Sequence, residues 1–174
     1  MTDFEKILQR LHENGVEFIL IGGVAARALG SSRLTDDIDI VYRRTLDNMQ
    51  RLVDALAPYH PYLRGAPAGL PFQWDVDTLK RGLNFTLTTR LGSIDLLGEV
   101  AGGGTYEQLL PFTVIVEISG IPCRCVNLTK LIELKRAAGR PRDLEAIAEL
   151  EVLRELYEEW GLSESGELQI QKGD

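Results

Sequence analysis

The segment DIDIVY at residues 37–42 constrains the fold of this chain more than any other part of its 174-residue sequence. Its strict alternation is typical of a β-strand and would place Asp37 and Asp39 on one face, with aliphatic side chains on the other. Two carboxylates at such positions lie about 6.6 Å apart along the backbone. On a largely buried strand they would repel each other and lose hydration. A protein tolerates this pair when cations compensate it, and two Mg²⁺ ions about 3.5–4 Å apart would do so while catalysing phosphoryl displacement.

An Asp-x-Asp pattern alone is weak evidence for a metal site, because acidic residues are common at strand starts and helix caps. Two other features accompany it here. Gly22-Gly23 ends an apolar run, where glycines would let a phosphate approach backbone N–H groups, although a tight turn explains them equally well. Asp95 stands alone in the apolar segment GSIDLLG, where an unpaired acid is costly unless it meets a charge or a metal. An outward-facing position on a half-exposed strand is the alternative for Asp95. Together, the glycine turn and the acids indicate one site.

The rest of the chain mixes helical and strand patterns without a regular β-α-β repeat. Helical spacing predicts helices at 3–14, 24–30, 46–57, 128–138 and 142–159. Apolar alternation predicts strands at 16–23 and 37–42 and strand pairs within 83–98 and 112–127. We expect loops at 58–74 and in the glycine-rich stretch after Gly98. This predicts an α+β fold, a mixed β-sheet flanked by helices with further helices at the C-terminal end. We expect a single domain at 1–160 and a polar, flexible tail at 161–174.

Charge and hydrophobicity argue against several classes of protein. The net charge is −7, so non-specific binding along duplex DNA is not expected. No apolar run approaches the roughly 20 residues of a membrane span, and the charged N-terminus does not resemble a signal peptide. We therefore expect no membrane association and a cytoplasmic location. Five basic residues gather within 130–142, and a solvated helix face explains them when they are taken alone.

Three other groups of residues carry weaker signals. Cys123 and Cys125 alternate within an apolar run, where a strand would pack both thiols on one side at a spacing that suits a disulfide poorly. The two histidines, His12 and His60, are distant from the acidic motifs in sequence. This argues against a metal-dependent phosphohydrolase whose metal site includes histidine. The aromatic residues of 59–74 could stack a base, but such residues more often cover a core.

The segment IGGVAARALGSSRLTDDIDIVYRR resembles the signature of the polymerase β-like nucleotidyltransferase superfamily. That signature is a Gly-Gly or Gly-Ser turn, a short helix, and a strand that alternates hydrophobic and acidic residues. The spacing of Arg33, Thr35, Asp37 and Asp39 is similar to that of bacterial nucleotidyltransferase-like proteins related to the abortive-infection, type IV toxin–antitoxin group. The segment NLTKLIELKRAAGRPRDLEAIAEL resembles that group's C-terminal element, in which Arg-x-x-Asp follows a helix lysine. The resemblance spans roughly residues 16–155.

The resemblance implies a nucleotidyltransferase fold and a Mg²⁺-dependent transfer of NMP from an NTP to a hydroxyl acceptor, with two ions. Asp37, Asp39 and Asp95 would be the catalytic and metal-binding residues, and Asp95 would help to activate the acceptor hydroxyl. Nucleotide binding would involve the following residues: Gly22, Gly23, Arg33, Thr35, Lys135 and Asp143. Lys135 would neutralise triphosphate charge, with a solvated helix lysine as the alternative. Asp143 also suits the first turn of a helix for electrostatic reasons alone.

The same resemblance suggests partners. The acceptor would be RNA, such as a tRNA end, or a protein, and the chain would act as a toxin with an antitoxin partner. Many superfamily members carry Ser just after the glycine turn, where this chain has Val24 and Ala25. The alternative is therefore a catalytically weak or inactive binding module with this fold, acting on a partner protein or a nucleotide.

Overall fold

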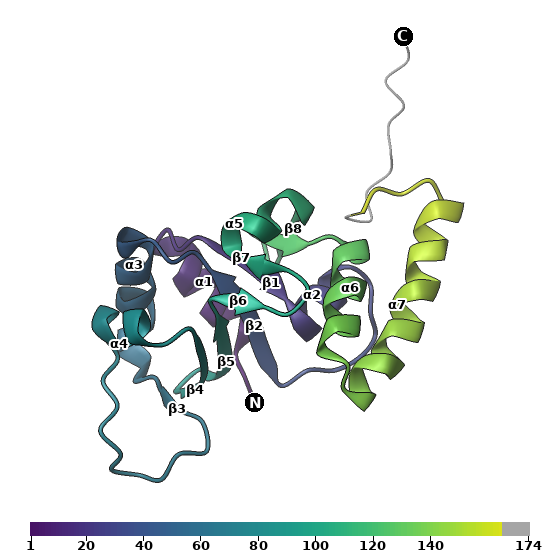
Figure 1. Ribbon diagram of the computed structural model, residues 1–174. Coiled ribbons are helices and arrows are strands. Elements are labelled where there is room, and N and C mark those ends of the chain that lie inside the picture. The colour runs from purple at the N-terminus through teal and green to yellow at the C-terminus, as the bar shows by residue number, and fades with distance from the viewer. Residues whose placement is uncertain (165–174) are drawn as a thin grey trace.

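The centre of the molecule is a seven-stranded mixed sheet (Figure 1) with strand order β3-β4-β5-β2-β1-β9-β8. The computed structural model describes residues 1–164, and residues 165–174 lie outside it. The strands of this sheet are β1 Phe18–Ile21, β2 Asp37–Tyr42, β3 Tyr62–Leu63, β4 Asn84–Thr89, β5 Gly92–Leu97, β8 Thr113–Ile118 and β9 Ile121–Val126. Strand β2 pairs antiparallel with β1 and parallel with β5, and β1 runs parallel to β9. The pairs β4–β5 and β8–β9 are antiparallel, as the two expected strand pairs require.

Helices flank this sheet, which confirms the α+β expectation (Figure 1). They are α1 Phe4–Glu13, α2 Gly22–Ala28, α3 Leu46–Leu56, α4 Val76–Arg81, α5 Tyr106–Leu109, α6 Leu128–Ala138 and α7 Pro141–Glu159. Side chains cap several helix N-termini: the Asn127 side chain accepts a hydrogen bond from the Lys130 N–H at 2.8 Å and so begins α6. Gly139, at φ +65°, ends that helix, and Pro141 begins α7 directly afterwards. The α6–α7 hairpin is therefore fixed by local sequence.

Strand β2 shows how alternation positions the site. Ile38, Ile40 and Tyr42 are fully buried, whereas Asp37 and Asp39 lie on the opposite face and are only partly buried. The parallel register with β5 pairs Asp39 with Asp95. Because paired residues of adjacent strands point to the same face, the three carboxylates share one side of the sheet.

The structure contains short elements that we did not expect. Helix α4 occupies residues 76–81, and a small hairpin, β6 Glu99–Val100 with β7 Gly104–Thr105, occupies the glycine-rich loop. The stretch 58–74, expected as mostly loop, also holds β3 and the end of a 3-10 turn at Ala57–Tyr59. A second 3-10 turn spans Leu110–Phe112. These elements have too few residues to show a hydrophobic period, which explains why the pattern does not reveal them.

The cysteines and most of the central aromatic residues belong to the core. Cys123 and Cys125 are buried free thiols, and burial raises their pKa values to about 11 and about 12. Tyr62 and Phe72 pack edge to face with ring centroids 6.0 Å apart, and the Trp74 indole N–H donates to the Val53 carbonyl at 3.0 Å. Tyr59, Phe72 and Trp74 pack against the core, which is the more common role of such residues.

The ends of the described chain add two observations. No helix within residues 1–164 combines the length and apolar character needed to cross a membrane. The tail expected at 161–174 falls mostly outside the described residues, but Glu164 accepts hydrogen bonds from the Thr129 N–H at 3.2 Å and hydroxyl at 3.0 Å. The start of this segment therefore contacts α6.

Candidate active site

Three carboxylates converge on one face of the sheet. Asp37, Asp39 and Asp95 each offer an oxygen, and these atoms all lie within 4.8 Å of one another. The side chains of Asp37 and Asp95 are 37% and 24% exposed, so the group is reachable from solvent while losing much of its hydration. The sequence separates Asp95 from the other two by more than fifty residues, and the parallel β2–β5 pairing brings it beside Asp39.

Asp39 carries the electrostatic cost of this arrangement. Its pKa is raised from 3.8 to about 7, first by burial and then by the charges of Asp37 and Asp95. A protonated Asp39 also shares a hydrogen bond with Asp95, whereas the Lys135 ammonium works in the opposite direction. Three acids held this closely therefore require positive charge from elsewhere when all are ionised.

The glycine turn lies directly against Asp39. Gly22 has φ +68°, and a Cβ at this position would lie 2.0 Å from Asp39 Oδ2. A Cβ on Gly23 would lie 2.7 Å from the Thr35 side chain. Both glycines are thus required by close approach, and Gly22 also by its left-handed conformation. Helix α2 begins here without a side-chain cap.

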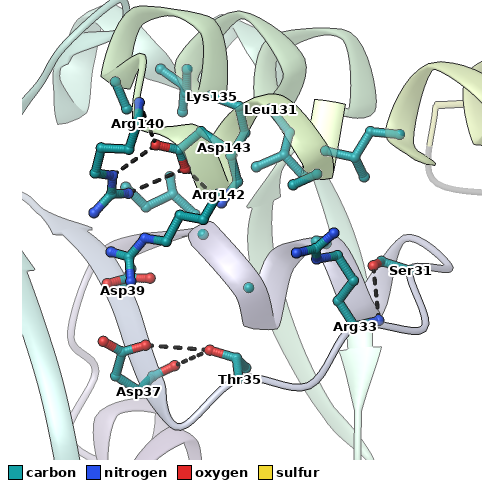
Figure 2. A pocket seen from close by; sticks show the side chains of 18 of the residues that line it. Ser31, Arg33, Thr35, Asp37, Asp39, Leu131, Lys135, Arg140, Arg142 and Asp143 are labelled. Carbon is teal, nitrogen blue, oxygen red and sulfur yellow. Dashed lines mark hydrogen bonds and ion pairs between the residues drawn. The ribbon is translucent and has the colours of Figure 1, made fainter. Parts of the chain in front are cut away.

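Thr35 and Arg33 belong to the loop that leads into β2. The Thr35 hydroxyl lies 3.3 Å from Asp37 Oδ1 and 3.2 Å from the Asp37 carbonyl, so it helps to orient Asp37 (Figure 2). The Arg33 guanidinium pairs with Glu145 of α7 at 3.4 Å, and both side chains are well exposed. Glu149 of α7 accepts from the Ser31 hydroxyl at 2.6 Å and the Ser32 N–H at 3.1 Å, which ties the loop to the helix.

Basic side chains from α6 and the start of α7 lie across from the carboxylates (Figure 2). Asp143 organises two of them, since it is only 1% exposed and contacts Arg140 Nε at 2.7 Å and Lys135 Nζ at 3.6 Å. Burial alone would raise the pKa of Asp143, but the hydrogen bonds and charge of Arg140, with the charge of Lys135, lower it below its usual value. Asp143 is therefore a fixed anion that positions cations.

Arg64 is a site residue that our sequence analysis missed. Its Nη2 lies 2.8 Å from Asp95 Oδ1, and its Nη1 lies 3.7 Å from Asp37 Oδ2. Nη2 donates its hydrogen bond to the Leu87 carbonyl at 2.8 Å, so the approach to Asp95 is an ion pair without hydrogen-bond geometry. A single arginine just after a two-residue strand belongs to no recognisable sequence pattern, and only the folded sheet places it beside the acids.

Arg140 and Arg142 were missed as site residues for a different reason: they form part of a basic stretch that we assigned to a solvated helix face.

One cavity of about 410 Å³ brings these groups together. All nine residues singled out from the sequence line it: Gly22, Gly23, Arg33, Thr35, Asp37, Asp39, Asp95, Lys135 and Asp143. Arg140 and Arg142 line it as well, with apolar side chains such as Leu131 and Leu134. Neither Val24 nor Ala25 lines this cavity, and both are buried. Side chains at the positions that follow the glycine turn thus contribute to the core and not to the cavity.

The donor set fits a hard divalent cation. Mg²⁺ prefers carboxylate oxygens, and three of them from two adjacent strands approach one another here. The absence of a Cβ at Gly22 leaves room for Asp39 Oδ2, which any other residue would displace. An acidic cluster pressed against a glycine turn and facing lysine and arginine side chains can hold a metal-bound polyphosphate.

Comparison with known proteins identifies the fold. No protein-family model matches this chain, and no curated protein matches it. Among solved structures, the lincosamide antibiotic adenylyltransferase LnuA with lincomycin bound superposes with a TM-score of 0.58 at 14% identity, over 87% of this chain and 98% of that one. ANT(2")-Ia in complex with adenylyl-2"-tobramycin superposes with a TM-score of 0.52 at 17% identity, over 89% of this chain and 94% of that one. The chain therefore has the nucleotidyltransferase fold expected from its sequence.

Proposed function

We propose that this chain is a Mg²⁺-dependent nucleotidyltransferase that transfers NMP from an NTP to a hydroxyl group of an acceptor. The observation that carries the proposal is the convergence of Asp37, Asp39 and Asp95 in one cavity, opposite the basic side chains of α6 and α7. The adenylyltransferases with the same fold support this class of reaction. An NTP donor also fits the cytoplasmic location expected from the sequence.

In this mechanism Asp37 and Asp39 would hold the divalent cation that accompanies the triphosphate, from the β2 side. Lys135 and Arg142 attract the phosphates from the other side of the cavity. Gly22 and Gly23 let the phosphates approach the backbone closely. A divalent cation bound by these carboxylates would offset the triphosphate charge and lower the pKa of the acceptor hydroxyl. Asp95 helps to orient that hydroxyl, whose oxygen bonds to the α-phosphorus as the bond to pyrophosphate breaks and the hydroxyl proton is released to solvent.

The acceptor has two candidate sources. The resemblance to the toxin–antitoxin group favours RNA, such as a tRNA end, or a protein. The two solved adenylyltransferases were captured with an antibiotic or an adenylylated antibiotic, which makes a small hydroxylated molecule the other class to test.

The test is transfer of label from each α-³²P-labelled NTP, in Mg²⁺, to total RNA, to a protein extract, to an aminoglycoside and to a lincosamide. We expect label in one acceptor class, and we expect Asp37→Ala and Asp39→Ala to lower it by at least about 100-fold. Asp36→Ala is the matched control, because Asp36 is exposed and does not line the cavity. NTP binding without transfer to any acceptor would reject the enzyme and favour the alternative, a binding module.

A toxin role is the biological extension of this proposal. It requires that induced expression arrests bacterial growth, that Asp39→Ala restores growth at equal protein level, and that a protein partner relieves the arrest. Normal growth with a fully active enzyme would exclude the toxin role and leave the transferase activity untouched.

A further inference from the structure

The backbone and side chain of Arg64 are both held by the neighbouring strand β4. The Arg64 N–H donates to the Thr86 carbonyl at 3.0 Å, and Nη2 donates to the Leu87 carbonyl at 2.8 Å. The side chain is 30% exposed. Its guanidinium is therefore positioned by the protein itself and does not depend on the carboxylates alone for its placement.

The guanidinium of Arg64 lies where it would repel a metal cation from one carboxylate oxygen, Asp95 Oδ1. Nη2 lies 2.8 Å from Asp95 Oδ1, a buried atom without a hydrogen-bond donor within the described chain. Mg²⁺ binds carboxylate oxygens at about 2.1 Å, so an ion on Oδ1 would lie against the guanidinium. Two positive charges at such a distance repel strongly. The oxygen Oδ1 is thus occupied by a fixed positive charge.

The charge within the carboxylate cluster itself, apart from the triphosphate that faces Lys135 and Arg142, points the same way. One guanidinium offsets one of the three carboxylate charges, and the two that remain equal the charge of one divalent ion. Within the proposed nucleotidyltransferase function, on which this step rests, we infer that the nucleotide-loaded site binds one divalent cation and that Arg64 takes the place of a second ion beside Asp95. This revises the two ions expected from the sequence. Asp37 and Asp39 would hold the single ion, with Asp95 beside them.

Manganese counting tests this inference without measuring transfer. The protein is saturated with a non-hydrolysable NTP analogue and titrated with Mn²⁺, and free Mn²⁺ is followed by electron paramagnetic resonance. We expect one bound Mn²⁺ for each nucleotide-loaded chain in the unaltered protein. Arg64→Ala should bind a second Mn²⁺ at least about tenfold more tightly than the unaltered protein does, because a nearby positive charge is removed. Arg64→Lys, which keeps the charge, should bind one.

Arg90→Ala is the matched control, because Arg90 is exposed and its side chain makes no hydrogen bond or ion pair within residues 1–164. It should bind one Mn²⁺, and circular dichroism establishes that each variant is folded. Two tightly bound ions in the unaltered protein, or a single ion in folded Arg64→Ala, would overturn the role of Arg64. Absence of nucleotide-dependent Mn²⁺ binding in every variant would instead reject the proposed function, so the two failures are distinguishable.

Discussion

At the scale of single residues, the site stores unfavourable charge in its metal-free state. Asp39 lies between two other acids, and burial adds to their effect on its pKa. Arg64 and Lys135 offset part of this repulsion, but neither donates a hydrogen bond to Asp39. The residues that would bind a metal therefore destabilise the protein without one.

The first prediction concerns pH. The pKa of Asp39 rises from 3.8 to about 7 on folding, so the folded state binds the proton more tightly. The stabilisation that protonated Asp39 gives the folded state is fully present below about pH 4 and is lost as pH rises through about 7. In EDTA at pH 8 we expect Asp39→Asn to increase the free energy of unfolding by about 1–3 kcal/mol relative to the unaltered protein, with no gain at pH 4. Urea unfolding across this range measures it. Equal pH slopes for Asp39→Asn and the unaltered protein would contradict the assigned pKa, and exposed Asp36→Asn serves as the control.

The second prediction separates backbone strain from contact at the glycine turn. Gly22→Ala should destabilise the protein by about 2–4 kcal/mol, because the residue has φ +68° and its Cβ would meet Asp39 Oδ2. Gly120→Ala is a matched control with φ +78° and no atom within 4 Å of the added Cβ, so it should cost only about 1–2 kcal/mol. Thermal unfolding compares the two, and Mn²⁺ binding should fall only in Gly22→Ala. Equal effects in both assays would show that Asp39 does not need the space at Gly22.

At the scale of elements, sequence periodicity predicted the helices and strands that neighbouring residues determine, and it missed the contacts between segments that are distant in sequence. The alternation in β2 assigned Asp37 and Asp39 to one face, and helical spacing predicted α6 and α7 close to their observed bounds. The parallel pairing of β2 with β5 has no local signature, because register between distant strands depends on the whole sheet. Arg64 could not be predicted for the same reason, since it follows β3 and two strands, β4 and β5, lie between β3 and the strand that carries Asp37.

The third prediction tests how the α6–α7 hairpin holds its cations. Asp143 is nearly inaccessible and pairs with Arg140 and Lys135, so Asp143→Asn should lower stability by about 2–4 kcal/mol at pH 7. Its pKa is lowered on folding, so this contribution is present above the unfolded pKa and disappears as pH falls through the folded value. Urea unfolding of the variant measures the loss. Glu145→Gln is the control, because the Arg33–Glu145 pair is exposed and should change stability by less than about 1 kcal/mol. Equal losses would mean that Asp143 acts as an ordinary surface charge.

At the scale of the whole molecule, the cavity lies between two parts of the fold with opposite charge. The sheet supplies the carboxylates, and the α6–α7 hairpin supplies Lys135, Arg140 and Arg142 (Figure 2). The hairpin is attached to the loop before β2 through Glu149 and to the end of α2 through a hydrogen bond from the Tyr157 hydroxyl to the Leu29 carbonyl. A nucleotide that contacts both sides would thus depend on this attachment, whereas a metal bound by the sheet alone would not.

The last prediction uses that difference. Glu149→Ala removes the acceptor of the Ser31 hydroxyl and the Ser32 N–H and so loosens the loop that carries Arg33 against α7. We expect NTP affinity, measured by calorimetry, to fall about 5- to 50-fold, because part of the binding energy must then order the loop. Binding of Mn²⁺ without nucleotide should change less than about twofold, since the carboxylates lie on the sheet. Glu155→Ala on the same helix is the matched control, as Glu155 is exposed and unpaired within the described chain. A parallel loss of Mn²⁺ and NTP binding would indicate that Glu149 supports the fold as a whole, and unchanged NTP binding would show that the nucleotide contacts the sheet alone.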